Sequence, residues 1–341
     1  MERRDFWRTH VRDIEEFGKT LRKGRMRELT KSAGGRPVYA IEYGEKPKIK
    51  RTANWASAMA AGRPEAFFGD TGGRTRGIVA IAGIHGAEVE GVMGIVNLAS
   101  VLETGRDLAG NERKEIARAA EGLRIVLVPL ANPDGRERLP IEDLIGGSLE
   151  DHHLYCQGRY ADGTLMEHPD CKKLHPMPKE VEFLGGYFND DGVNIQADCE
   201  FTNFLARETK ALCELVVEEV PEAVANMHSH STEPMFFYTG WSMPAAYDIR
   251  RAQVAEVVYG KLAERNLRPM PLYRWKEQET FAIDSLFHFL TGSLPLIVEC
   301  PHGMASLPYT REEILEIQMT FHEVFLTMLA KEGLRPPLGA T

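Results

Sequence analysis

Histidine and acidic residues cluster directly after four short apolar runs of this sequence. Because the carboxyl ends of parallel strands meet at one edge of an open α/β sheet, where ligands bind, the four clusters are expected to build one site. Histidines and carboxylates that meet in this way are typical metal ligands and acid–base groups. The clusters are His85–Glu88 after Ile78–Ala82, Asn132–Gly135 after Leu123–Leu130, His228–Ser231 after Ala223–Met227, and Glu299–Gly303 after Leu294–Val298.

The residue types predict a catalytic metal centre. A catalytic zinc takes three protein ligands, often two histidines and one carboxylate, and keeps a fourth position open. His85 and Glu88 lie three residues apart at a predicted strand-to-helix junction, so one turn of chain can direct both at one ion. Either His228 or His230 can supply the third ligand from a neighbouring strand, and Glu299 is then free to act as a general base. Ordinary surface pairs are the alternative, but they do not explain four clusters at matching strand ends.

Strands and helices alternate along the chain, which predicts an α/β domain with a mostly parallel sheet and helices on both faces. The four apolar runs are typical of strands buried on both faces, and Val38–Tyr43 is a further strand. The pattern divides the chain into an N-terminal helical extension over residues 1–30 and one catalytic domain over residues 31–335. A polar, glycine-rich excursion interrupts the domain at about 136–192. Helical patterns cover 88–103, 200–219, 245–265, 280–290 and 311–331.

Composition excludes several classes of function. The 341 residues include 41 Lys and Arg against 50 Asp and Glu, a net charge of −9, which argues against binding to nucleic acid. No apolar run reaches the roughly 20 residues that span a bilayer, and the first residues do not form a secretory signal. Five cysteines are an odd number and fit a reducing compartment, so we expect a cytoplasmic protein that binds no membrane. Whether the helix at 311–331 covers the sheet or forms a dimer face is left open.

Five segments resemble the carboxypeptidase A-like zinc carboxypeptidases, in order, over roughly residues 25–330. The resemblance implies the fold of that family, with His85, Glu88 and His228 as zinc ligands and Glu299 as the base. It favours His228 over His230, which falls where the family has a substrate-pocket residue. The segments are the opening strand at Thr30–Pro37, the ligand loop in Ile78–Gly91, the Asn-Pro-Asp-Gly motif at Asn132–Gly135, the third-ligand segment Met227–Ser231 and the strand Leu294–Glu299.

One departure from the family concerns the substrate. The family's Gly-Val-Asp-x-Asn-Arg-Asn segment supplies an Asp behind a ligand histidine and an Asn-Arg pair that grips the terminal carboxylate of the substrate. The matching stretch Gly192–Asp198 carries Asn194 at the Asp position, Gln196 in the pair and Ala197 at the Arg position. Alanine cannot form a bidentate carboxylate clamp. Asn194 can still form a hydrogen bond to a ligand histidine, but it lacks charge. We expect Asn194, Gln196 and His230 at the substrate, which is not an ordinary peptide C-terminus.

Two further family roles can be assigned only to candidates. The arginine that stabilises the oxyanion should lie in the excursion, where Arg159 is favoured and Arg136 is the alternative. The family's substrate-contacting tyrosine precedes the catalytic glutamate by about two dozen residues, and Tyr273 is the nearest match. Alternatively, Tyr273 is an aromatic residue of a strand or of the pocket rim that has no contact with the substrate.

Histidines and cysteines also gather within the excursion, at His152, His153, Cys156, His168, Cys171 and His175. A structural zinc uses four such ligands, but the spacing here matches no established pattern. Surface loops are often rich in histidine by chance, and a milder functional interpretation has one or two of these histidines lining the mouth of the pocket. The sequence therefore favours one zinc per chain over two.

The leading hypothesis is a zinc-dependent hydrolase that cleaves an amide bond in a small peptide or modified amino acid. An N-acyl-amino-acid deacylase of the aspartoacylase and succinylglutamate desuccinylase type is the alternative within the same chemistry. That branch also carries an Asn-Arg pair, so Ala197 counts against it too. From another class, the chain could be a non-catalytic zinc-binding relative. Such a relative has no physical need for Glu299.

Overall fold

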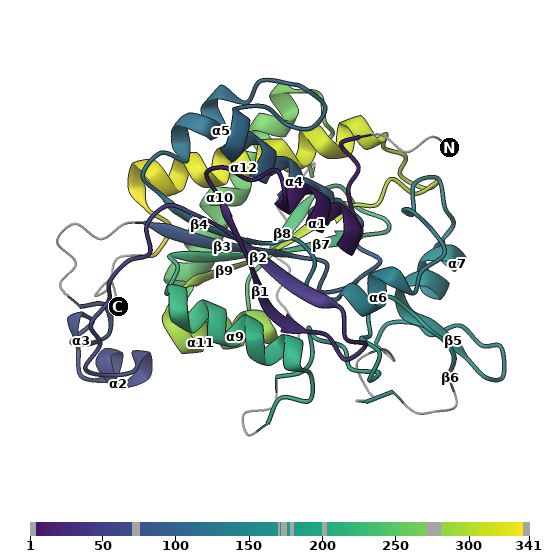
Figure 1. Ribbon diagram of the computed structural model, residues 1–341, viewed down its shortest axis with the longest axis horizontal. Coiled ribbons are helices and arrows are strands. Elements are labelled where there is room, and N and C mark those ends of the chain that lie inside the picture. The colour runs from purple at the N-terminus through teal and green to yellow at the C-terminus, as the bar shows by residue number, and fades with distance from the viewer. Residues whose placement is uncertain are drawn as a thin grey trace.

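Four apolar strands buried on both faces form the centre of a seven-stranded mixed sheet (Figure 1). The computed structural model describes residues 5–69, 76–169, 171, 176, 177, 181–199, 203–270 and 281–336. The strand order is β1-β2-β4-β3-β7-β9-β8, in which the four central strands run parallel and the others antiparallel. The strands are β1 (Arg25–Lys31), β2 (Pro37–Tyr43), β3 (Gly77–Ala82), β4 (Arg124–Val128), β7 (Ala223–His230), β8 (Phe236–Tyr238) and β9 (Leu294–Pro301).

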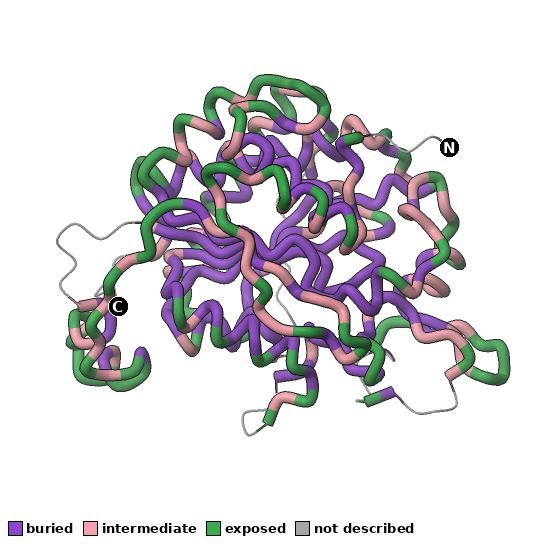
Figure 2. Tube along the Cα trace, in the orientation of Figure 1, coloured by how far each residue is buried: buried purple, intermediate pink, exposed green. Residues whose placement is uncertain are grey.

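Helices cover both faces of the sheet and enclose a core on each side (Figures 1 and 2). One face packs against α4 (Val89–Thr104), α10 (Ala245–Glu264) and α12 (Arg311–Glu332), the other against α9 (Arg207–Glu219) and α11 (Ile283–Thr291). This is the α/β architecture with a mostly parallel sheet that the sequence predicts. No helix in the described ranges is both long and apolar enough to cross a membrane. The shorter helices are α1 (Val11–Gly18), α2 (Trp55–Ala60), α3 (Glu65–Phe68), α5 (Lys114–Ala119) and α6 (Pro133–Glu137).

The N-terminal segment differs from the helical extension expected over residues 1–30. Among the described residues 5–30 only α1 is an α-helix. Residues 25–31 form the edge strand β1, which pairs with β2 from Arg25 opposite Glu42 to Lys31 opposite Pro37. Trp7 is fully buried and belongs to the main core together with Ile14 of α1. The segment is therefore part of the domain, because its apolar residues cover the sheet instead of forming a core of their own.

The excursion at 136–192 lies beside the carboxyl ends of the central strands, where its residues line one side of a cavity (Figure 1). It contains α7 (Leu149–His152), the π-helical turn η1 (His153–Gln157) and the two-stranded sheet of β5 (Gly158–Tyr160) and β6 (Val181–Leu184). Its buried Cys156 packs in one small apolar cluster with Ala87, which lies in the loop after β3. The excursion thereby reaches the segment that carries the predicted metal ligands.

Candidate metal centre and active site

The structure brings His85, Glu88 and His228 together at the ends of two adjacent strands. Glu88 immediately precedes α4, and its two carboxylate oxygens lie 2.8 Å from Nδ1 of His85 and 2.8 Å from Nδ1 of His228. The backbone N–H of Ser229 also donates to this carboxylate, over 3.2 Å. One ligand atom from each of the three residues lies within 4.8 Å of the others, and all three residues are buried. Two histidines and one carboxylate are a donor set that zinc uses in catalytic sites, so these residues fit that ion.

The two histidines favour the deprotonated, negatively charged form of Glu88. Burial alone would raise the pKa of Glu88, but His85 and His228 outweigh it and hold that pKa well below its ordinary value. Burial lowers the pKa of His228, yet the Glu88 charge dominates and raises it to about 9. For His85 burial prevails and its pKa is lowered. Glu88 is therefore an anion, the form in which a carboxylate binds a cation.

Two residues orient His85 from behind. Its Nε2 donates to Oδ1 of Asn194 over 3.2 Å, and Tyr187 stacks on the ring with centroids 3.8 Å apart and planes 15° apart. Because Nε2 is engaged by Asn194, Nδ1 is the atom presented to the centre. The hydrogen bond from His85 is the contact that the sequence predicts for Asn194. Asn194 is buried and does not line the cavity, so its expected role in binding the substrate is not supported.

The loop that carries the ligands packs backbone against backbone on the Asn-Pro-Asp-Gly segment. A Cβ added at Gly86 would lie 2.2 Å from the backbone nitrogen of Arg136 and 2.4 Å from the carbonyl carbon of Gly135, which no side chain can do. The Gly86 N–H donates to the carbonyl of Gly186 over 2.6 Å. Glycine at this position therefore permits the close approach that fixes the loop between His85 and Glu88.

Asp134 has a structural position instead of the expected place in the shared site. It is fully buried and accepts hydrogen bonds from Ser32 Oγ and from the backbone N–H groups of Gly34 and Asp190. Its carboxylate also pairs with Arg36 at 2.7 Å. Asp134 does not line the cavity, so only three of the four polar clusters supply residues to it. The cluster Asn132–Gly135 instead holds the turn before β2 against α6, through the contacts of Asp134.

A cavity of about 490 Å³ opens over the three ligands. Glu299 lies on its wall, opposite His228 in the pairing of β7 with β9, so the two side chains share one side of the sheet. His230 also lines the cavity and is only partly buried. The remaining lining residues are His152, His153, Gln157, Glu167, His168, Tyr187, Gln196, Ser229, Ser231, Tyr238 and Ile297.

Gln196 lines the cavity, but its amide group is engaged by buried partners. Its Nε2 donates to Asp284 over 2.7 Å, and its Oε1 accepts from Nδ2 of Asn226 over 3.0 Å. Ala197, at the position of the family's arginine, is not among the lining residues. Gln196 therefore lines the cavity, as expected from the sequence, and its side chain is held in one orientation by Asp284 and Asn226.

Neither arginine that the sequence offers for the oxyanion lies at the cavity. Arg159 lies on β5, where its guanidinium pairs with Glu182 at 2.9 Å, and it is absent from the lining. The alternative, Arg136, is fully buried and donates to the carbonyls of Ile141 and Glu142, again away from the cavity. Among the described lining residues there is neither lysine nor arginine. Tyr273 lies outside the described residues.

Histidines take the place of these cations on the described wall. His152, His153 and His168 of the excursion line the cavity, where the milder functional interpretation of the histidine-rich segment expects one or two histidines. His175 lies outside the described residues. Tyr187 was missed by sequence reasoning, since no spacing or motif connects it with a ligand histidine more than a hundred residues earlier in the chain.

Comparison with known proteins identifies the class. The sequence model described as zinc carboxypeptidase matches residues 23–320, so this chain belongs to the zinc carboxypeptidase family. No curated protein matches the chain in sequence. Membership of this family, together with the buried His85–Glu88–His228 group, supports a metallohydrolase.

Solved structures share the fold at low sequence identity. A metallo-carboxypeptidase from Burkholderia cenocepacia is 14% identical, with a TM-score of 0.55 over 93% of this chain and 68% of its own. Carboxypeptidase A from Helicoverpa armigera is 11% identical, with a TM-score of 0.53 over 95% and 74%. A metallo-carboxypeptidase from Pseudomonas aeruginosa, in complex with (2-guanidinoethylmercapto)succinic acid, is 11% identical, with a TM-score of 0.52 over 93% and 67%. These similarities confirm the predicted fold.

Proposed function

We propose that this protein is a zinc-dependent hydrolase that cleaves an amide bond in a small peptide or modified amino acid. The observation that carries the proposal is the placement of Glu299 on the cavity wall opposite His228, beside a buried group of two histidines and one carboxylate. A general base next to a metal centre is the arrangement that hydrolysis of an unactivated amide requires. A protein that only binds zinc has no need for this carboxylate.

The side chains divide the chemistry among them. His85, Glu88 and His228 would hold the ion, which when bound supplies Lewis-acid activation of the carbonyl group and of a water molecule. Glu299 accepts a proton from the attacking water and returns it to the leaving amine. Asn194 and Tyr187 keep the imidazole of His85 in position while this happens.

The cavity favours a small substrate without a free carboxylate at the position of the family's arginine. Its volume of about 490 Å³ lies within the usual range for small-molecule sites, roughly 300–1,000 Å³. Ala197 cannot bind a carboxylate, and the described wall offers imidazoles such as His153 and His230 where a bidentate guanidinium would be needed. An amidated or otherwise modified terminus avoids burying an unpaired charge there.

Replacing Glu299 by glutamine tests the proposed base. We expect Glu299→Gln to keep the fold and its zinc and to lower kcat by about 10²–10⁴-fold, the usual contribution of a general base. Glu121→Gln, on an exposed turn, is the matched control and should leave both zinc content and kcat unchanged. Turnover near that of the wild type in Glu299→Gln, with zinc present, would remove Glu299 from the base role.

Matched substrates test the proposed specificity. Short peptides that differ only in a free or an amidated C-terminus should be cleaved at similar rates, or the amidated one faster. A strong preference for the free carboxylate would contradict the proposal. Turnover confined to N-acyl amino acids would favour the deacylase, and zinc binding without hydrolysis of any amide would favour the non-catalytic relative.

A further inference from the structure

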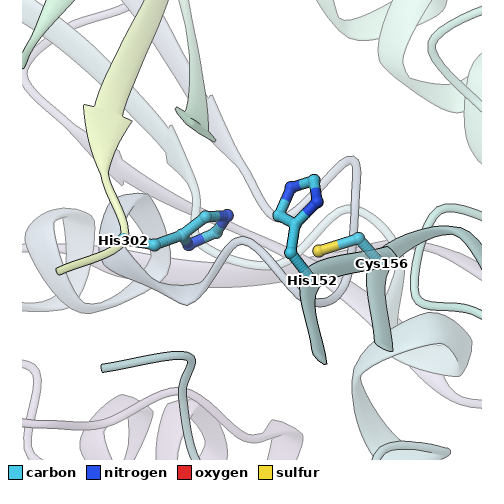
Figure 3. Close-up of side chains that lie close together, drawn as sticks. All are labelled: His152, Cys156 and His302. Carbon is cyan, nitrogen blue, oxygen red and sulfur yellow. The ribbon is translucent and has the colours of Figure 1, made fainter. Parts of the chain in front are cut away.

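A second group of potential metal ligands lies outside the predicted centre. His152 ends α7, Cys156 lies in η1, and His302 directly follows β9, so the group joins the excursion to the end of a central strand. One donor atom from each residue lies within 4.8 Å of the others, and all three residues are buried. Figure 3 shows the two imidazole rings next to each other, with the Cys156 sulfur beside His152. The ring centroids lie 5.5 Å apart and the ring planes are inclined by 61°.

Two buried nitrogens in this group have no hydrogen-bond partner among the residues that the structure describes. His302 uses Nδ1 to contact Oε1 of Glu90 at 3.0 Å, which leaves its Nε2 buried with no partner. Nδ1 of His152 is likewise buried and without a partner. An unsatisfied buried polar atom costs about 1–3 kcal/mol, so two of them beside a thiol need an explanation. A bound cation that accepts their lone pairs supplies one.

Glu90 holds His302 in the orientation that a metal ligand needs. The glutamate is fully buried, and its second oxygen accepts from Ser229 Oγ at 2.6 Å, so the carboxylate is fixed between two elements. A carboxylate that binds one ring nitrogen of a histidine typically orients the other nitrogen toward a metal. Neither Glu90 nor His302 has a role in the mechanism proposed above.

We propose that His152, Cys156 and His302 bind a second metal ion, zinc in the first instance, separate from the His85–Glu88–His228 centre. Two imidazoles and one thiolate are ligands that zinc prefers, and three protein ligands leave a fourth position open. The proposal departs from the single zinc favoured by the sequence. The third ligand is His302, which lies far outside the segment 152–175, so the spacing within that segment could not reveal the site.

The site is placed to fix the wall of the substrate cavity. His152 and Cys156 are four residues apart, on one side of the helical segment, and His152 also lines the cavity. Binding of one ion by these two residues and by His302 would attach the excursion to β9.

Metal content and a cobalt spectrum test the proposal together. Full-length protein saturated with Zn²⁺ and freed of excess should hold two ions per chain, and Cys156→Ser and His85→Ala should each hold one. With Co²⁺ in place of zinc, the wild type should show a thiolate-to-cobalt charge-transfer band in the near ultraviolet. This band reports on the second site alone, because the His85–Glu88–His228 centre contains no sulfur.

Controls separate the two centres and guard against a variant that fails to fold. His85→Ala should keep the band although it loses hydrolysis, and Cys156→Ser should lose it. Cys213→Ser, a buried thiol in α9 on the opposite face of the sheet, should keep both ions and the band. A wild-type protein with one ion and no charge-transfer band overturns the proposal without any variant, and a band that survives in folded Cys156→Ser overturns it as well. A wild-type protein that binds two ions and shows the band but hydrolyses no amide would refute the proposed hydrolase, and the proposal of a second metal site would still hold.

Discussion

Removing the carboxylate of Asp134 tests whether the Asn-Pro-Asp-Gly motif supports the site or takes part in it. Asp134→Ala deletes the acceptor for Ser32 Oγ and for the N–H groups of Gly34 and Asp190, and it leaves Arg36 without this partner. The side chain is fully buried, so water cannot replace the lost acceptor without rearrangement.

The expected loss follows from these contacts. A buried donor left without a partner costs about 1–3 kcal/mol, and breaking a buried ion pair by removing one member costs about 3–5 kcal/mol. The Arg36 side chain is 35% exposed, so its share is reduced by solvent and most of the effect comes from the hydroxyl and the two amides. We expect the free energy of unfolding to fall by about 3–5 kcal/mol.

Urea unfolding of the metal-free protein is the appropriate assay, because a bound metal would itself stabilise the folded state. Asp190→Ala is the matched control: it removes partly exposed pairs with Arg36 and Arg138 and should cost no more than about 1 kcal/mol. At saturating zinc, Asp134→Ala should keep its metal and its turnover, since Asp134 does not line the cavity. A loss of stability no larger than that of the control, or a loss of turnover in a stable zinc-loaded variant, would refute the structural role.

Three further predictions concern the ligand loop, the third ligand and pH. Gly86→Ala should weaken zinc binding at least tenfold in a competition assay with a chelator, because the added methyl displaces the loop from the Gly135 backbone; unchanged affinity would show that the close packing is not needed. His228→Ala should lose zinc from this centre while His230→Ala keeps it, measured by metal content, and the reverse result would move the third ligand. Glu103→Gln should lower stability at pH 7: burial raises the pKa of Glu103, but the N–H groups of residues 22–24 outweigh it and lower that pKa. The stabilisation is therefore present above the ordinary glutamate pKa and disappears as the pH falls through the lowered value, so unfolding curves of the two proteins should converge in acid; a constant difference would contradict this assignment.

The arrangement of the sheet could be predicted from local patterns. β3, β4, β7 and β9 are buried on both faces, and such strands are recognisable as short uninterrupted apolar runs in the sequence. The ligand group could be predicted for the same reason, because residues that follow parallel strands must meet at one edge. β1 was not predicted, since its polar, half-exposed residues carry no strong alternation and their strand form depends on pairing with β2.

The sequence could not decide which arginine or acidic side chain faces the cavity, because this depends on how a long polar segment folds back over the sheet. Arg159 matched the expected residue type, yet its orientation depends on pairing with Glu182 in the β5–β6 hairpin. Asp134 sits in a motif that resembles a site, but its partners come from the turn before β2, which no spacing connects with it.

The sequence by itself determined the class of this protein and the group His85, Glu88 and His228 that we propose as its metal centre, because strand burial and residue order are local properties of the chain. Tertiary structure alone decided which polar residues face the cavity and which support it. The meeting of His152 and Cys156 with His302 shows the difference most clearly: about 150 residues separate them along the chain, and only the packing of the excursion against the end of β9 brings their donor atoms within 4.8 Å.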